Sequence, residues 1–154
     1  MKNKAVVVKP LIFNTYIAVI KNSVGSALFK NYYAKVNGKK KDIMRQGELS
    51  CAFYASSVLV LFKLIKEVHG TVDSTTNDLK KSGWKAIKKP RLGSILVWEK
   101  LDFGGETHKH IGFYIGNNKA ISNSYQLGYP FIHHWSFNNK RKVDFIFWNQ
   151  KLSK

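Results

Sequence analysis

The sequence is short of cysteine, of acidic residues and of long apolar runs. Its single cysteine, Cys51, excludes an intramolecular disulfide, so this residue is either a small buried hydrophobe or a reactive thiol. No stretch of about 18 apolar residues runs without a charge, which excludes an obvious membrane span. The early apolar run is split by Lys9-Pro10 and no small-residue cleavage site follows, which argues against a signal peptide. We therefore predict a cytoplasmic protein.

The chain also lacks internal repeats, low-complexity tracts and Pro/Gly/Ser-rich linkers. Its 154 residues are 44% hydrophobic and 14% aromatic, a composition that excludes general disorder. We predict one domain over residues 1–154, with a helical N-terminal part over about 10–45 and a core over about 46–150.

Acidic residues are outnumbered: 26 Lys and Arg face 9 Asp and Glu, for a formal charge of +17. A positive field of this kind attracts acidic peptides, nucleic acid or anionic lipid head groups, and charge alone does not choose among them. The lysines form short clusters, such as Lys39–Lys41 and Lys88–Lys89, which also suit a merely solvated surface.

Helical signals dominate the first half of the chain. Residues 11–35 predict one or two helices, and Asn37-Gly38 between short strand-like runs predicts a hairpin over about 33–44. A helix capped by Ser50 is expected to continue to about Val68, with apolar residues around its surface. A shorter helix is expected over about 74–81, capped by Asp73 or Ser74.

Strand signals dominate the second half. Four runs rich in β-branched and aromatic residues, at 94–98, 110–115, 119–122 and 143–148, are separated by turn residues. They predict a meandering antiparallel sheet. Helices followed by strands describe an α+β domain in which the Cys51 helix packs on the sheet.

Cys51 lies at the start of its predicted helix. A thiol is nucleophilic as thiolate, and unpaired N–H groups and the helix dipole at this position lower a cysteine pKa. First-turn amides also lack intrahelical acceptors, so the Cys51 N–H can bind an oxyanion. The alternative is a structural cysteine.

Five histidines are candidate bases for this thiol: His69, His108, His110, His133 and His134. His69 ends the predicted cysteine helix, a helix length away from Cys51. His133 and His134 lie in an expected aromatic loop. His108 and His110 open a strand on one face, and they could equally be two ligands of a metal site that lacks its other ligands.

Three segments carry a resemblance to a known superfamily: QGELSCAF, GSILVW and HIGFYIGNNKAIS. Their order and spacing resemble the NlpC-type and papain-like cysteine peptidases over residues 46–124, about half of the chain. The resemblance implies a papain-like (NlpC-type) fold with Cys51 as nucleophile, His110 as base and Ser122 as the side chain that orients His110. Ser50 stands where cell-wall peptidases usually have aspartate.

A Cys-His-Ser set is similar to that of the vasohibins, and the whole chain most resembles the small vasohibin-like cysteine proteases of candidate phyla radiation bacteria. That resemblance offers a second orienting group for His110, the backbone carbonyl of Leu127. The resemblance of QGELSC to papain-like enzymes implies that Gln46 is an oxyanion donor, although an exposed loop glutamine is an alternative. Tyr54, one turn into the helix, could line the cleft or pack in the core, and packing is favoured.

The expected function is hydrolysis of a peptide or amide bond through a thioester, with no cofactor and no metal, on a peptide or protein that is acidic. A deamidase or acyltransferase would use the same site. From another class, a basic nucleic-acid-binding module would use exposed aromatics, with candidates at Tyr125, Tyr129, Phe131 and Trp135.

Asn123 or Ser124 would replace Ser122 as the hydrogen-bond acceptor for His110 if the strand register slipped by one residue, since neighbouring residues face opposite sides of a strand.

Overall fold

The protein has a mixed α+β fold, seen in a computed structural model that describes residues 4–153. Residues 1–3 and 154 of the predicted domain lie outside this part. The helices are α1 (Ile12–Asn22), α2 (Cys51–Leu61) and α3 (Val72–Lys81), with 3-10 turns η1 (Ala27–Phe29) and η2 (Gln150–Leu152). The strands are β1 (Tyr33–Val36), β2 (Lys39–Asp42), β3 (Lys85–Ala86), β4 (Ile95–Phe103), β5 (Glu106–Gly116), β6 (Lys119–Asn123), β7 (Pro130–His134) and β8 (Val143–Trp148).

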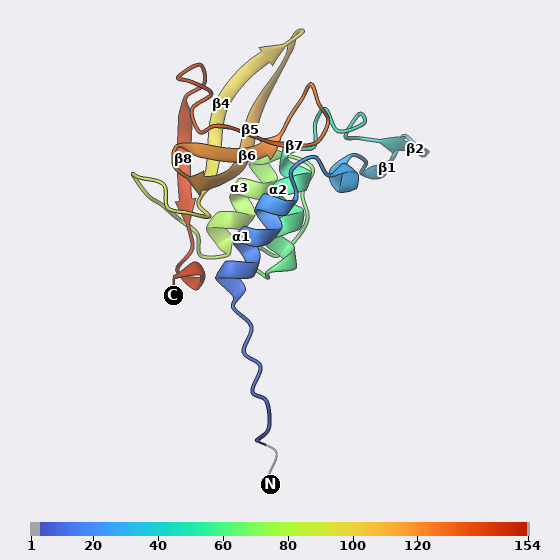
Figure 1. Cartoon of the computed structure of the whole chain (residues 1–154). Coiled ribbons are helices and arrows are strands. Elements are labelled where there is room, and N and C mark those ends of the chain that lie inside the picture. Colours follow the sequence, from blue (N-terminus) through green and yellow to red (C-terminus); the bar gives the residue numbers. More distant parts are fainter. Residues whose placement is uncertain (1–3, 154) are drawn as a thin grey trace.

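The main sheet is antiparallel, with strand order β3-β8-β4-β5-β6-β7. The predicted meander is therefore present from β4 to β7, whereas β8 crosses to the other side of β4. The three helices lie together against one side of this sheet (Figure 1), and α2 packs on β5 and β6.

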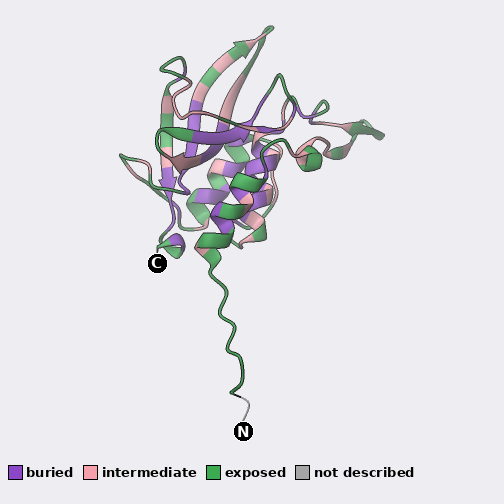
Figure 2. Cartoon of the chain, in the orientation of Figure 1, coloured by how far each residue is buried: buried purple, intermediate pink, exposed green. Residues whose placement is uncertain are grey.

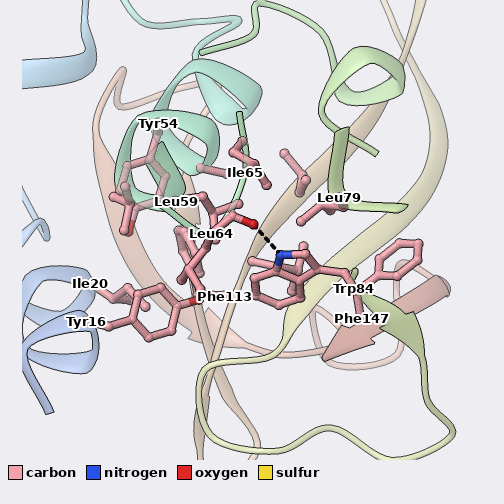
Figure 3. Close-up of a cluster of buried hydrophobic side chains, with 14 of the residues drawn as sticks. Tyr16, Ile20, Tyr54, Leu59, Leu64, Ile65, Leu79, Trp84, Phe113 and Phe147 are labelled. Carbon is pink, nitrogen blue, oxygen red and sulfur yellow. Dashed lines mark hydrogen bonds between the residues drawn. The ribbon is translucent and has the colours of Figure 1, made fainter. Parts of the chain in front are cut away.

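The core fills the space between the helices and the sheet. Figure 3 shows side chains of all three helices meeting Trp84, Phe113 and Phe147, and the Trp84 indole N–H donates to the Leu64 carbonyl at 2.8 Å. Strand alternation sends Leu96 and Trp98 to the opposite face, under aromatic residues of the 135–146 segment. Both faces of the sheet are thus covered, and polar groups between them are shielded from water.

The two helices after residue 50 differ from their predicted bounds. Helix α2 ends at Leu61 instead of about Val68, because the Asp78 carboxylate of α3 accepts the Lys66 and Glu67 amides and Lys63 has φ +54°. Helix α3 begins earlier than predicted, and its cap is Thr71, whose hydroxyl accepts the Ser74 N–H.

Strands β3 and β7 were not expected. Strand β7 covers His133 and His134, for which the sequence predicts a loop, and it pairs with β6 so that His133 lies opposite Ala120. The register places Ser122 opposite both Gly112 of β5 and Phe131 of β7. This register decides which side chains meet in the site.

The predicted hairpin is present as β1 and β2, joined at Asn37-Gly38, where both residues have positive φ as such turns require. It projects from the body of the molecule and is largely exposed (Figure 2). The longest helices within residues 4–153 have 11 residues, which is too short to span a bilayer.

Candidate active site

A cavity of about 880 Å³ opens where the start of α2 meets the sheet. Its walls come from the loop before α2, the start of α3, strands β4 to β7 and the loop before β8. They include Cys51, His110 and Arg141. The cavity therefore brings together the predicted nucleophile, the predicted base and Arg141, a cation for which the sequence predicts no role in the site.

Cys51 is the first residue of α2, as predicted, and Ser50 is its N-cap, although the Ser50 hydroxyl makes no capping hydrogen bond. The preceding loop is held against the β6–β7 turn. A Cβ on Gly47 would overlap the Gly128 carbonyl, and the Gly47 carbonyl accepts the Asn123 amide at 2.6 Å. Close backbone packing thus fixes the entry to the helix.

Burial raises the pKa of the Cys51 thiol, opposite to the direction expected for a helix N-terminus. The Ile111 and Ala52 amides and the Arg141 guanidinium oppose this effect without reversing it. The helix start was predicted correctly, but the lowered pKa was not, because desolvation of the thiolate outweighs these groups. The resting thiol is neutral.

Cys51 and His110 share the cavity, and the Ile111 N–H, next to His110 in β5, faces the Cys51 sulfur. Within residues 4–153, no hydrogen bond joins the Cys51 sulfur to the His110 ring. Burial, with smaller contributions from Arg141 and His133, lowers the pKa of His110 well below its usual value. The pair is therefore a neutral thiol and a neutral imidazole.

His110 belongs to a chain of short hydrogen bonds. Its Nε2 lies 2.7 Å from the Ser122 hydroxyl, and the same hydroxyl lies 2.8 Å from Nε2 of His133. Nδ1 of His133 lies 2.8 Å from the carbonyl oxygen of His134. Three strands, β5, β6 and β7, each supply one side chain of this His110–Ser122–His133 chain.

The direction of these bonds follows from the last acceptor. A carbonyl only accepts, so Nδ1 of His133 carries a proton and its Nε2, in the neutral ring, accepts the Ser122 O–H. The Ser122 oxygen is then an acceptor for His110 Nε2–H. His110 is left with an unprotonated Nδ1, the form that a general base needs.

Aromatic rings enclose this chain. The Phe137 ring stacks on His133 at 4.0 Å between centroids, and the Trp98 ring lies 5.3 Å from His110 and 5.5 Å from His133. Ser122 has no exposed surface. A Cβ on Gly112 would lie 2.6 Å from the Ser122 Cβ, so glycine leaves the room that the serine occupies.

Arg141 is 7% exposed, and its guanidinium donates to the Glu99 and His108 carbonyls at 2.9–3.1 Å. No carboxylate of the described chain lies within ion-pair distance of it. Its charge, which forms no direct ion pair within the described chain, favours the Cys51 thiolate and lowers the pKa of His110 and His133. Arg141 thus makes the cavity a place where negative charge is stabilised.

Three other predicted site residues do not line the cavity that contains Cys51. Leu127 is 48% exposed and forms no hydrogen bond with His110 in the described chain; its N–H donates to Ser124. Gln46 is exposed and lines a separate hollow with Leu127. Tyr54 is buried in the core, and its hydroxyl lies 2.7 Å from that of Ser23. It therefore packs in the core, the alternative that the sequence favours over lining the cleft.

The remaining histidines have other partners. His69 lies 2.7 Å from Asp78 at the base of α3, outside the cavity, and His108 faces Glu106 at its rim. Within residues 4–153, no group of three or more His, Cys, Asp or Glu side chains could hold a metal ion.

No protein-family model matches the chain, and no curated protein matches it significantly.

Sequence reasoning missed Arg141 and left His133 as one of five candidate bases. Arg141 stands in a lysine-rich stretch, where nothing marks one cation as buried. His133 could have been paired with Ser122 only if β7 had been predicted, because the strand register brings them together.

Proposed function

We propose that the chain is a papain-like, vasohibin-like cysteine peptidase that cleaves a peptide or amide bond through a thioester. The observation that carries this proposal is the arrangement in one cavity of Cys51, at a helix start, and His110, whose Nε2 is held by Ser122. Nucleophile, base and orienting group are the parts that acyl transfer by a thiol requires.

In the proposed reaction, His110 Nδ1 takes the thiol proton as the Cys51 sulfur attacks the carbonyl carbon of the substrate. The resulting tetrahedral anion collapses to a thioester, and the amine leaves with the proton from His110. Water, deprotonated by the same nitrogen, then hydrolyses the thioester. The sulfur must come within hydrogen-bond reach of Nδ1, a tightening that is common once substrate fills such a site.

Negative charge develops at two atoms during the proposed reaction, first on the Cys51 sulfur and then on the carbonyl oxygen of the substrate. The Cys51 N–H at the start of α2 is the proposed oxyanion donor, and the Arg141 charge supports both anions. Because the resting thiol is neutral, proton transfer accompanies attack instead of preceding it. This predicts slow reaction with small alkylating agents and faster reaction with peptides that fill the cavity.

The proposed substrate is an acidic polypeptide. The β1–β2 hairpin carries Lys35, Lys39, Lys40 and Lys41, all exposed, and it leads directly into Ile43 and Met44 of the cavity wall. Lys35 and Lys40 are directly opposite each other, a like-charge pair that costs stability unless an anion lies nearby. Charge complementarity thus favours an acidic chain entering from this side.

The test uses an epoxysuccinyl peptide, which alkylates a thiol by ring opening, and intact mass to count adducts. The native protein should gain one adduct, Cys51→Ala none, and His110→Ala should react at least about 100-fold more slowly, the usual contribution of a general base. Incubation with acidic and neutral peptides of equal length then identifies cleavage. Labelling only after denaturation, or unchanged labelling in His110→Ala, would count against the proposal.

A further inference from the structure

The Ser122 hydroxyl is shared between two imidazoles, which an orienting serine does not require. One acceptor contact would suffice to hold His110, yet Ser122 lies 2.7 Å from His110 Nε2 and 2.8 Å from His133 Nε2. A serine hydroxyl has one proton and can point it either way. If His133 were absent, the Ser122 hydroxyl could donate its proton to His110 Nε2 instead of accepting a proton from it. His110 would then carry its own proton on Nδ1.

We propose that His133 is a positioning residue that sets the direction of the Ser122 hydroxyl and, through it, the tautomer of His110. This inference rests on the proposed function only in the role that it gives His110 as a base.

The geometry makes His133 an acceptor. Its Nδ1 is committed to the His134 carbonyl at 2.8 Å, which leaves the Nε2 lone pair for the Ser122 O–H. Its ring is clamped between Phe137, at 4.0 Å and an interplanar angle of 15°, and Phe131, at 4.8 Å and 29°. The ring therefore keeps one orientation, and the hydroxyl follows it.

The surroundings keep His133 neutral. Burial lowers the pKa of His133 to about 4, and the positive charge of Arg141 and the neighbouring His134 act in the same direction, while the hydrogen bond to the His134 carbonyl opposes them. At neutral pH the ring thus accepts a hydrogen bond. If it took up a proton, Nε2 would become a donor, Ser122 would turn its proton towards His110, and His110 Nε2–H would lose its acceptor.

The first experiment observes the tautomer directly and needs no substrate. In ¹⁵N-labelled full-length protein, the two ring nitrogens of His110 should show a protonated Nε2 and a bare Nδ1. His133→Phe keeps a stacked ring but removes the acceptor, so it should mix the two forms. His133→Gln offers a side-chain oxygen and should restore most of the Nε2–H form. His69→Gln, outside the cavity, should change nothing at His110.

The second experiment measures coupling through the rate of labelling by the epoxysuccinyl peptide. His133→Phe should slow labelling about tenfold, the size of effect seen when the outer hydrogen-bond partner of a metal-bound histidine is lost, with little change in the half-saturating peptide concentration. In a Ser122→Ala background, the same substitution should have no further effect, because His133 acts only through that hydroxyl.

An unchanged His110 nitrogen pattern in His133→Phe overturns the inference. So does an equal slowing by His133→Phe with and without Ser122, since that would show a merely structural role. If His110 responds to His133 but Cys51 in the native protein never reacts, the positioning role stands and the proposed peptidase function fails. The two failures are therefore distinguishable.

Discussion

Polar side chains are buried and neutral in the His110–Ser122–His133 chain, whereas they are exposed and charged in the β1–β2 hairpin. In the sheet, the three polar groups stay neutral, because burial disfavours charge and each group satisfies the next. In the hairpin, four lysines stay exposed and charged, because water solvates them. The first arrangement suits proton transfer and depends on exact geometry, whereas the second suits capture of an anion and tolerates change.

The largest expected effect comes from crowding the buried chain. Gly112→Ala places a methyl group 2.6 Å from the Ser122 Cβ, in a strand where backbone shift is restricted. We expect labelling of Cys51 to fall about 100-fold or more, and stability to fall by about 1–3 kcal/mol as in other overpacked cores. Gly70→Ala is the control for an added methyl group at the cavity wall, since its Cβ would meet only ordinary contacts at 3.6 Å or more. Equal labelling in the two variants would refute the close fit.

Mild acid should affect the sheet before the hairpin, because hydrogen bonds that outweigh desolvation lower the pKa of Asp42 in β2 to about 2. The pKa of His133 is about 4 in the folded protein, below the ordinary value near 6.5, so the unfolded chain takes up the proton first. Stability is therefore fully present above about pH 6.5 and falls as the pH drops towards 4, by up to about 3 kcal/mol from this group. Urea unfolding at several pH values measures this slope.

His133→Phe removes one of two buried imidazoles with a lowered pKa, the other being His110, and should therefore reduce the slope between these pH values. A slope that is the same in wild type and variant would show that His133 is not buried as a neutral ring.

Loss of Arg141 should matter less than the crowding caused by Gly112→Ala, because Arg141 acts through its charge and leaves the hydrogen-bonded side chains in place. Arg141→Gln should slow labelling about tenfold, raise the pKa of the Cys51 thiol further and raise the pKa of His110, since the cation that favours thiolate and opposes imidazolium is gone. The pH dependence of Cys51 alkylation and the His110 NMR titration report these shifts. Arg141→Lys, which keeps the charge, should lie closer to wild type; if both variants behave alike, charge is not the cause.

The smallest effect is expected in the hairpin. Replacing Lys35 and Lys40 by Gln should weaken binding of an acidic peptide a few-fold at low salt, leave labelling at saturation unchanged, and leave stability equal or slightly higher because a like-charge pair is removed. Lys88 and Lys89 offer the same change in charge at an exposed place outside the cavity.

Fluorescence anisotropy of an acidic peptide, read against an oligonucleotide of equal charge, separates the possible partners. If replacing Lys88 and Lys89 weakens binding of the acidic peptide as much as replacing Lys35 and Lys40, the hairpin contributes only through the general positive charge of the protein. Preference for the oligonucleotide would favour the nucleic-acid-binding alternative.

The sequence by itself determined the α+β class, the hairpin at Asn37-Gly38 and the start of a helix at Cys51, because turn residues, periodicity and caps act over a few neighbouring residues. It also placed His110 and Ser122 on adjacent strands.

Only the tertiary structure decided the state of the site. The end of α2 at Leu61 depends on Asp78 of α3, and the raised pKa of Cys51 depends on desolvation by surrounding chain. The meeting of Ser122 with His133 depends on an unpredicted strand, and the burial of Arg141 on the fold of a lysine-rich loop. Burial and strand register depend on many contacts between residues far apart in the chain, so no local sequence pattern predicts them.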